Sequence, residues 1–443
     1  MSQKPHRILS VVPKEHQWLR DLTAVLSRAK IPWHNAVLAD RVLKIQVSGR
    51  DEPFFALVAR LPESDMPGYK RTSRFVIGYD GSRSLTAQQR DWLDRFYGWL
   101  SSAESSLPPE LEGFAAIGNR IGAPEDIIRG MFPFVTVERS QVVEDPGQGE
   151  VLEVLVRATS RCNQACPFCS APRHDEPDSK ILWACLRAAS DLLPGAMVSL
   201  TGGEPTLRPA FLAEVEATLS LNFSRVQIQT NAVRFADRLD PGSLPKSDLL
   251  TFFVSLHALD QAIYDSCTGT NGQLPHAQTG LVRILEAGHD TIVNTVICRE
   301  NIHHLNEMVQ RLADMVPGDN RPVMHFSVLI CPEWNPEAAK HLVRYSEVVP
   351  ALTRASETAR GLGLNLQLSS THASLPVCLL GGEADRHYYE IQPNETGYED
   401  YARPWVKADG CRECRETQHC LGVPRPYAEK FGLEELAPLE AEE

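Results

Sequence analysis

The sequence predicts an α/β protein with a central parallel sheet, preceded by an α+β module and followed by an irregular, cysteine-rich tail. Two observations support this prediction. From about residue 151, short β-rich runs alternate six times with helical stretches, which is typical of parallel strands joined by right-handed crossovers. Near the end, this alternation stops and Gly, Pro and Cys become frequent. The predicted divisions are 1–150, 151–370 and 371–443.

The first division has the patterns of a small mixed module. Its predicted elements are a helix over 14–30, strands over 41–49, 54–61 and 74–82, and a helix over 86–103 that Thr86 caps. Gly49, Arg50 and Asp51 separate the first two strands, and this favours a hairpin. The edge of such a sheet could bind an extended peptide, but the pattern does not single out that role.

The second division contains the alternating series. Its β-rich runs are 151–159, 196–203, 225–232, 249–258, 290–298 and 323–330. Helical stretches are predicted at 182–193, 210–221, 280–288, 303–315 and 347–362. Periodicity alone does not decide whether the sheet closes into a full or partial barrel. In either case, ligands gather at the carboxyl ends of parallel strands.

Composition narrows the class of protein. The formal net charge of −13 argues against nucleic-acid binding and against docking on an anionic membrane. No apolar run approaches the roughly 20 residues that span a bilayer, and the N-terminus lacks the apolar core of a secretory signal. We therefore expect a soluble, cytoplasmic protein with no membrane partner.

Three cysteines follow the first β-rich run of the series, as Cys162-x3-Cys166-x2-Cys169. One loop with this spacing can present three thiolates to three corners of an iron-sulfur cube. The fourth iron then stays open, and an open coordination position distinguishes a reactive metal site from a closed structural one. A zinc site is the alternative, but zinc normally takes four ligands.

Cys162, Cys166, Phe168 and Cys169 resemble the radical S-adenosylmethionine (SAM) superfamily, whose hallmark is Cys-x3-Cys-x-aromatic-Cys. The resemblance covers about residues 154–335. It implies a partial (β/α)6 TIM-like barrel and a [4Fe-4S] cluster that carries SAM on its open iron. It also implies an enzyme that cleaves SAM reductively to a 5'-deoxyadenosyl radical, which abstracts hydrogen from a substrate. The protein positions both molecules and excludes water.

Further motifs of the same family occur at the ends of the following runs. The second run ends in a Gly-Gly-Glu-Pro segment that resembles the motif holding the SAM amino group, and the third ends in Thr-Asn-Ala where the family commonly has Thr-Asn-Gly. The residues that the resemblance assigns to SAM binding are Phe168, Gly202, Gly203, Glu204, Pro205, Asn231, Ser255 and Asn294. For the last three, a cap of a strand or helix is the simpler alternative. His257 is expected to support the site or fill the core.

The tail contains a second group of cysteines: Cys378, Cys411, Cys414 and Cys420. Four thiols can ligate every iron of one auxiliary [4Fe-4S] cluster, and zinc is the lesser alternative. The Cys-x2-Cys-x5-Cys spacing resembles the auxiliary-cluster regions called SPASM and twitch. A SPASM domain carries about seven cysteines, so the resemblance implies a single cluster here, with a structural or electron-transfer role.

The other cysteines are expected to be buried packing residues, as for Cys185 in an apolar helix and Cys298 after a strand. Cys267 lies in the stretch Asp-Ser-Cys-Thr-Gly-Thr-Asn-Gly, which we predict to be a loop at the barrel mouth. It is the one candidate for a catalytic thiol that handles a radical or a proton.

The leading functional hypothesis is a radical SAM enzyme that modifies a peptide or protein. The alternative is an enzyme of a small metabolite or cofactor precursor, similar to the molybdenum-cofactor branch. A more remote alternative is an iron-sulfur protein for electron transfer, which would need neither the Gly-Gly-Glu-Pro segment nor an open iron. The expected partners are the substrate and an electron donor such as flavodoxin or ferredoxin.

Overall fold

The computed structural model describes 35–39, 42–47, 54–60, 75–80, 128, 132, 134–141, 150–172, 174–316, 320–332, 334–368, 375–380, 405–417, 420 and 422–440. The chain divides into two compact units. One comprises residues 1–137 and 177–195, and the other comprises residues 138–176 and 196–443.

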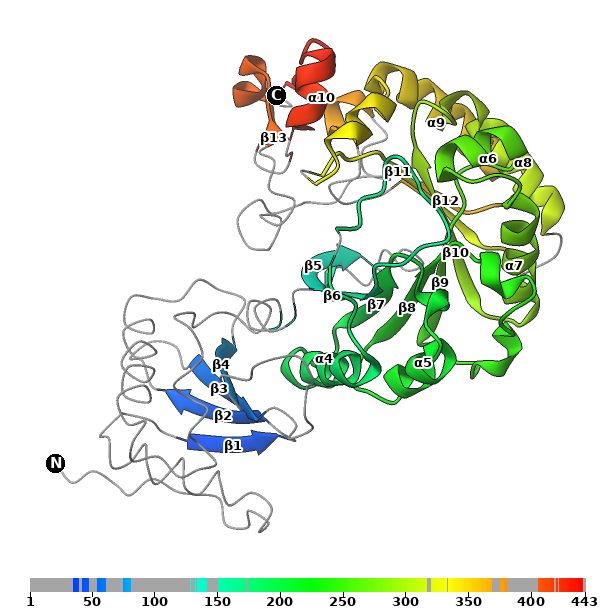
Figure 1. Ribbon diagram of the computed structural model, residues 1–443. Helices are drawn as coiled ribbons and strands as arrows, with labels where there is room; N and C mark the ends of the chain where they lie inside the picture. Colours follow the sequence, from blue (N-terminus) through cyan, green and yellow to red (C-terminus); the bar gives the residue numbers. More distant parts are fainter. Residues whose placement is uncertain are drawn as a thin grey trace. The chain divides into compact units, whose positions relative to one another are not determined.

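The first unit contains a four-stranded antiparallel sheet of order β1-β2-β3-β4 (Figure 1). Its strands are β1 (Asn35–Ala39), β2 (Val42–Val47), β3 (Phe54–Arg60) and β4 (Phe75–Asp80). The last three confirm the predicted strands, and Val47 pairs with Phe54 next to the predicted hairpin turn. β1 was not predicted. The two predicted helices, at 14–30 and 86–103, lie outside the described residues.

The same unit includes helix α4 (Ser179–Leu192), which begins three residues before the predicted one. Its first turn is fixed by Asp178, whose carboxylate accepts a hydrogen bond from the Ile181 amide at 2.8 Å. An aspartate in this position satisfies one of the unpaired amides at a helix start. Cys185 of α4 is fully buried, as predicted for a packing thiol.

The larger sheet has eight strands in the order β12-β11-β10-β9-β8-β7-β6-β5. The strands are β5 (Val135–Gln141), β6 (Glu150–Thr159), β7 (Met197–Gly202), β8 (Arg225–Thr230), β9 (Leu250–Ser255), β10 (Asp290–Ile297), β11 (Val323–Val328) and β12 (Leu366–Leu368). Every pairing from β6 to β12 is parallel. The predicted α/β fold with six successive parallel strands is therefore confirmed, whereas β5 and β12 were not predicted.

The helices of this unit lie along the outside of the curved sheet, as in a partial barrel (Figure 1). They are α5 (Phe211–Leu219), α6 (Gln261–Thr268), α7 (Leu274–Glu286), α8 (Leu305–Met315) and α9 (Tyr345–Gly361). The tail adds a two-stranded pair, β13 (Trp405–Val406) and β14 (Val423–Pro424), and helix α10 (Arg425–Phe431). None of the described helices is both long and apolar enough to cross a membrane.

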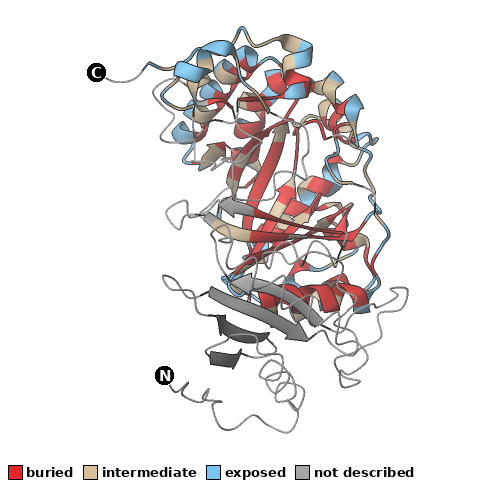
Figure 2. Ribbon diagram, turned by 90° about the vertical axis from the view of Figure 1, so that its left-hand side faces the viewer, coloured by how far each residue is buried: buried red, intermediate tan, exposed pale blue. Residues whose placement is uncertain are grey.

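Alternation along the strands gives the sheet two different faces. Thr295 bonds the sulfur of Met308 in α8, so the odd-numbered residues of β10 face the helices. On the neighbouring strands the buried residues of that face are apolar, for example Val254 of β9 and Phe326 of β11. Most of the ribbon of the large sheet is buried (Figure 2). The opposite, concave face carries polar side chains such as Ser255, Asn294 and His325.

We expect Gly280→Ala to destabilise the protein by about 2 kcal/mol or more, because its Cβ would lie 2.0 Å from the Ala232 carbonyl oxygen. Gly361→Ala is the matched control, since no heavy atom lies within 4 Å of the added carbon at the end of α9. There, alanine should leave stability unchanged or raise it by up to about 1 kcal/mol. Urea denaturation measures the free energy of unfolding of both variants. Equal changes in the two would contradict the close approach of Gly280 in α7 to Ala232.

Candidate active site at the carboxyl edge of the sheet

The predicted motifs meet at one edge of the large sheet, where the parallel strands end. Gly202 is the last residue of β7 and pairs with Thr159, the last of β6. Ser255, the last residue of β9, pairs with Asn294 of β10. The cysteines follow β6 in an irregular segment, residues 160–170, which we call the cluster loop.

The three thiols of the cluster loop lie close to one another. Burial raises the pKa of Cys166, and the neighbouring thiols of Cys169 and Cys162 raise it further. Burial also raises the pKa of Cys162, to about 11. A bound cation would stabilise the thiolate forms that burial disfavours. Cys162 and Cys169 are exposed, so the ligand set is open on one side. These features fit an iron-sulfur cluster with three protein ligands.

The Gly-Gly-Glu-Pro segment holds the start of the cluster loop. The Gly203 amide donates to the Thr159 carbonyl at 2.6 Å, and the Glu204 amide donates to the Arg161 carbonyl at 2.7 Å. A Cβ on Gly203 would lie 2.1 Å from the Arg161 oxygen. Glycine is therefore required because two backbones meet here. Pro205 begins the short 3-10 helix η5 (Pro205–Leu207) and is buried.

The Glu204 carboxylate is almost completely buried, at 1% exposure, and ties this segment to the end of β8. One oxygen accepts hydrogen bonds from the amide and hydroxyl of Thr206 and from the hydroxyl of Thr230. The other accepts the Asn231 amide at 2.7 Å. Burial raises the pKa of Glu204, whereas these hydrogen bonds favour its charged form.

Asn231 connects the same edge to the cluster loop. Its side-chain amide donates to the Asn163 side chain at 2.8 Å, and its side-chain oxygen accepts from the Val233 amide. The next residue, Ala232, has φ 60°, a left-handed conformation that is unfavourable for any residue with a Cβ. Glycine adopts this conformation without strain, which explains why it is common at this position of the family motif. Ala232 of this chain adopts it with strain.

Sequence reasoning missed the contacts that hold the middle of the cluster loop. The Ala165 amide donates to the Thr268 carbonyl at 2.8 Å, and Gln164 donates to the Tyr264 hydroxyl at 2.8 Å. Both partners belong to α6. The segment containing Cys267 was predicted as a loop, and that was wrong: Asp260 caps α6 and left-handed Gly269 ends it. These two cap residues were the signal available in the sequence.

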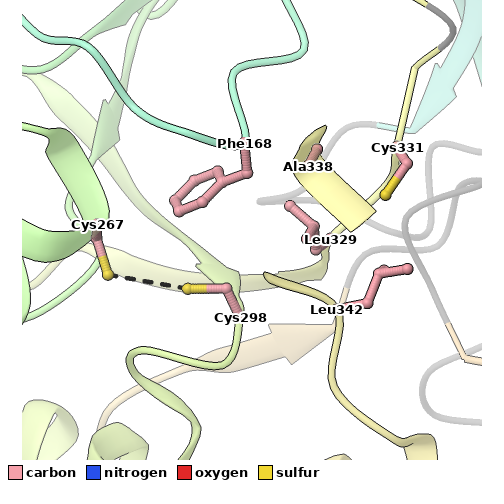
Figure 3. Packing of buried hydrophobic residues seen from close by; sticks show 7 residues of the cluster. All are labelled: Phe168, Cys267, Cys298, Leu329, Cys331, Ala338 and Leu342. Atoms are coloured by element: carbon pink, nitrogen blue, oxygen red, sulfur yellow. Dashed lines mark hydrogen bonds between the residues drawn. The ribbon is translucent and has the colours of Figure 1, made fainter. Parts of the chain in front are cut away.

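Phe168 belongs to the cluster loop, and its side chain is buried beneath the loop with 5% exposure. Its buried neighbours include Cys267, Cys298 and Leu329 (Figure 3). The thiols of Cys267 and Cys298 are 3.8 Å apart, and both residues are fully buried. Cys267 therefore packs below the loop rather than at an open barrel mouth. His257 meets Phe168 edge-on at 5.4 Å and is also buried, as expected for a supporting residue.

On the concave face, Ser255, Asn294 and His325 occupy one row across β9, β10 and β11. His325 Nδ1 donates to the Asn294 side-chain oxygen at 3.0 Å, because an amide oxygen can only accept. The Ser327 hydroxyl approaches the same oxygen at 3.3 Å. Burial lowers the pKa of His325 to about 4, so its imidazole is neutral at pH 7. Sequence reasoning did not single out His325, and the strand register alone places it in one row with the predicted residues Asn294 and Ser255.

The four cysteines of the tail also come together, although a long stretch of sequence separates Cys378 from the others. Cys378, Cys411, Cys414 and Cys420 all line one hollow. Burial raises the pKa of Cys378, and the other three thiols raise it further. Among the described residues, no three His, Cys, Asp or Glu side chains converge on a single point suited to one metal ion.

Residues 156–312 match the family model of the Radical SAM superfamily. With the parallel sheet and the motifs at its carboxyl edge, the match identifies this part of the chain as the domain of radical SAM enzymes. It begins in β6 and ends in α8. The tail and the N-terminal strands lie outside the matched residues.

Three curated relatives overlap this region. A probable GTP 3',8-cyclase of Methanopyrus kandleri is 30% identical over 171 residues, 38% of this chain and 54% of that protein. A GTP 3',8-cyclase of Haemophilus influenzae is 27% identical over 175 residues, 38% of this chain and 51% of that protein. The PqqA peptide cyclase of Gluconobacter oxydans is 25% identical over 252 residues, 55% of this chain and 68% of that protein. The chain thus spans about half the length of the first two.

Among solved structures, Streptococcus suis SuiB bound to S-adenosylmethionine aligns with a TM-score of 0.45 and 17% identity. The alignment covers 66% of this chain and 77% of SuiB.

We expect His325→Asn to flatten the pH dependence of stability between pH 7 and pH 5. In the unfolded chain histidine binds a proton near pH 6.5, whereas folded His325 stays neutral down to about pH 4. Stability from this residue is therefore lost as the pH falls, by about 2 kcal/mol at pH 5. Urea titrations at both pH values measure the free energy of unfolding, and an equal change between the two pH values in parent and variant would contradict the lowered pKa of His325.

Proposed function

We propose that this protein is a radical SAM enzyme that cleaves SAM reductively at a [4Fe-4S] cluster held by Cys162, Cys166 and Cys169. The observation that carries the proposal is the cluster loop itself. Three adjacent thiols lie on a backbone that the Gly-Gly-Glu-Pro segment holds in place through Gly203 and Glu204.

When bound, the cluster and SAM supply a 5'-deoxyadenosyl radical, which takes a hydrogen atom from the substrate. The protein's share is positional. Buried Glu204 fixes the Gly-Gly-Glu-Pro segment against the end of β8. Within the described part of the chain, one of its carboxylate oxygens accepts a single hydrogen bond, so this oxygen could also accept one from the SAM amino group. Ser255 and Asn294 present polar groups to the concave face, where the sugar and carboxylate of SAM would lie. A flavodoxin or ferredoxin would supply the electron.

We further propose that the tail binds one auxiliary [4Fe-4S] cluster through Cys378, Cys411, Cys414 and Cys420. Four thiols around one hollow supply a complete ligand set for such a cluster. Thiols that bind different irons need not converge on one point, whereas zinc requires all its ligands around a single ion. Zinc bound by the same four thiols is the lesser alternative.

For the substrate, we favour a peptide or protein. A tail with an auxiliary cluster is a feature of many peptide-modifying relatives, and the similarity to the PqqA peptide cyclase extends over 252 residues. The four-stranded sheet has two edge strands, β1 and β4, that could take up an extended peptide. These points support the proposal, and a gene for a short peptide beside that of this protein would strengthen it.

A small metabolite or cofactor precursor is the second candidate. The observation that favours it is the higher identity, 30%, to a probable GTP 3',8-cyclase. The polar concave face, with Arg157, Gln229 and His325 in addition to the predicted residues, also suits a small polar molecule.

Cys162→Ala should abolish the cleavage of SAM, because two thiols cannot hold the cluster with one iron open. The measurement is anaerobic: reconstituted protein, SAM and dithionite, with 5'-deoxyadenosine quantified over time. Cys185→Ala is the matched control, since that thiol is buried in α4, and its variant should retain the activity of the parent. Undiminished product from Cys162→Ala would refute the assignment.

Replacing both Cys411 and Cys414 with alanine should remove about four of the roughly eight irons expected from two cubes. The first cluster should remain, since its ligands lie in the cluster loop. Iron and sulfide analysis of the reconstituted protein, together with zinc analysis of the protein as purified, measures the outcome. An unchanged iron count would contradict the auxiliary cluster, and loss of one zinc per chain would establish the alternative.

A further inference from the structure

One segment connects the cluster loop to the tail. Residues 334–342, which we call the bridge segment, comprise Trp334, Asn335, the 3-10 helix η9 (Pro336–His341) and Leu342. The bridge segment follows β11 and precedes α9, and it lies beyond the residues that match the radical SAM family model. Its two ends make contacts of different kinds.

At its first end, the bridge segment holds the last part of the cluster loop. The side-chain amide of Asn335 donates to the carbonyl of Pro167 at 3.0 Å and to that of Cys169 at 3.2 Å. The Trp334 indole donates to the carbonyl of Ser170 at 3.1 Å. One carboxamide therefore fixes the backbone on both sides of Phe168, and it fixes the third cysteine ligand itself.

At its other end, the bridge segment accepts hydrogen bonds from α10 of the tail. The Lys430 ammonium donates to the carbonyls of Ala339 at 2.7 Å and Leu342 at 3.2 Å. These are hydrogen bonds from a charged donor, which are stronger than those between neutral groups. In addition, Phe431 of α10 packs against the same buried cluster that contains Phe168.

Helix α10 is in turn bound tightly to its surroundings. Tyr427 stacks on Tyr345 at the start of α9, with ring centroids 3.9 Å apart, and its hydroxyl accepts the Tyr345 amide at 2.8 Å. Between the tail cysteines and α10 stands only a short connection: the Gly422 amide donates to the Cys420 thiol at 3.3 Å, and β14 follows. Helix α10 thus follows the last tail cysteine directly, through β14.

We propose that the bridge segment couples the two cysteine groups, with Asn335 as a positioning residue for Cys169 and Lys430 as its connection to the tail. This inference rests on the proposed function. A filled tail site fixes α10, α10 fixes η9 through Lys430, and Asn335 then holds Cys169 in the orientation that suits the cluster and SAM. Because coupling between two sites is reciprocal, SAM binding should also stabilise the tail.

The test uses the full-length protein with both clusters reconstituted anaerobically. SAM is titrated into the dithionite-reduced protein, and its dissociation constant is read from the change in the electron paramagnetic resonance spectrum of the first cluster. We expect Asn335→Ala and Lys430→Met to keep the parent's iron content and to weaken SAM binding about three- to tenfold. Asn335→Asp, which keeps the shape but lacks the N–H donor, should behave like Asn335→Ala.

Lys340→Met is the matched control. Lys340 belongs to the same 3-10 helix and is exposed, and among the described residues its ammonium pairs only with exposed Glu337. This variant should therefore bind SAM like the parent. If Asn335→Ala and Lys430→Met also bind SAM like the parent, the inference is overturned. Lys430 lies on the surface and is far from the cluster loop in sequence, so its replacement should not prevent folding. Lys430→Met therefore keeps the test valid if Asn335→Ala fails to fold.

A double-mutant cycle tests the coupling itself. Replacing Cys411 and Cys414 with alanine should weaken SAM binding in the parent but should have no further effect in the Asn335→Ala background. Fully additive losses would overturn the coupling, since independent sites add. If the parent binds SAM tightly and the Cys411/Cys414 double variant binds it equally tightly, this inference alone is refuted. If the spectrum of the parent's first cluster does not change when SAM is added, the proposed function is refuted as well.

Discussion

The site depends on how an irregular loop is held. The cluster loop has no regular backbone pairing of its own, yet three thiols on it must keep fixed relative positions. Its carbonyls and amides are therefore bonded by other elements: Gly203 and Glu204 at its start, α6 at its middle and Asn335 at its end. Each of these elements follows a different strand. The parallel sheet matters because it brings their ends to a single edge.

The sheet also separates packing from chemistry. Side chains alternate between its faces, so one set of residues is buried against the helices and the other lines the concave side. Val254 and Phe326 belong to the first set, and Ser255 and His325 belong to the second. Polar groups on consecutive strands can thus be neighbours, as Asn294 and His325 are at 3.0 Å, without interrupting the apolar core.

The two cysteine groups belong to one compact unit, although the family match covers only the first. Between them stand the bridge segment and α10, whose contacts are made through a few polar side chains and a pair of stacked tyrosines. Lys430 and Asn335 bond backbone carbonyls rather than side chains. Such contacts constrain the course of the chain, which is what a cluster ligand requires of the residues around it.

The sequence alone determined the alternation of strands and helices, the three-ligand cluster loop and the Gly-Gly-Glu-Pro segment, because these are local patterns of spacing and periodicity. The match over residues 156–312 confirms the predicted resemblance to the radical SAM superfamily for that part of the chain, while the ligand roles of the cysteines stay predictions. Only the tertiary structure decided which residues support the loop. Tyr264, Asn335 and His325 carry no local signal, since each acts through a partner distant in sequence. The helix containing Cys267 was misread because the glycines after it outweighed the Asp260 cap.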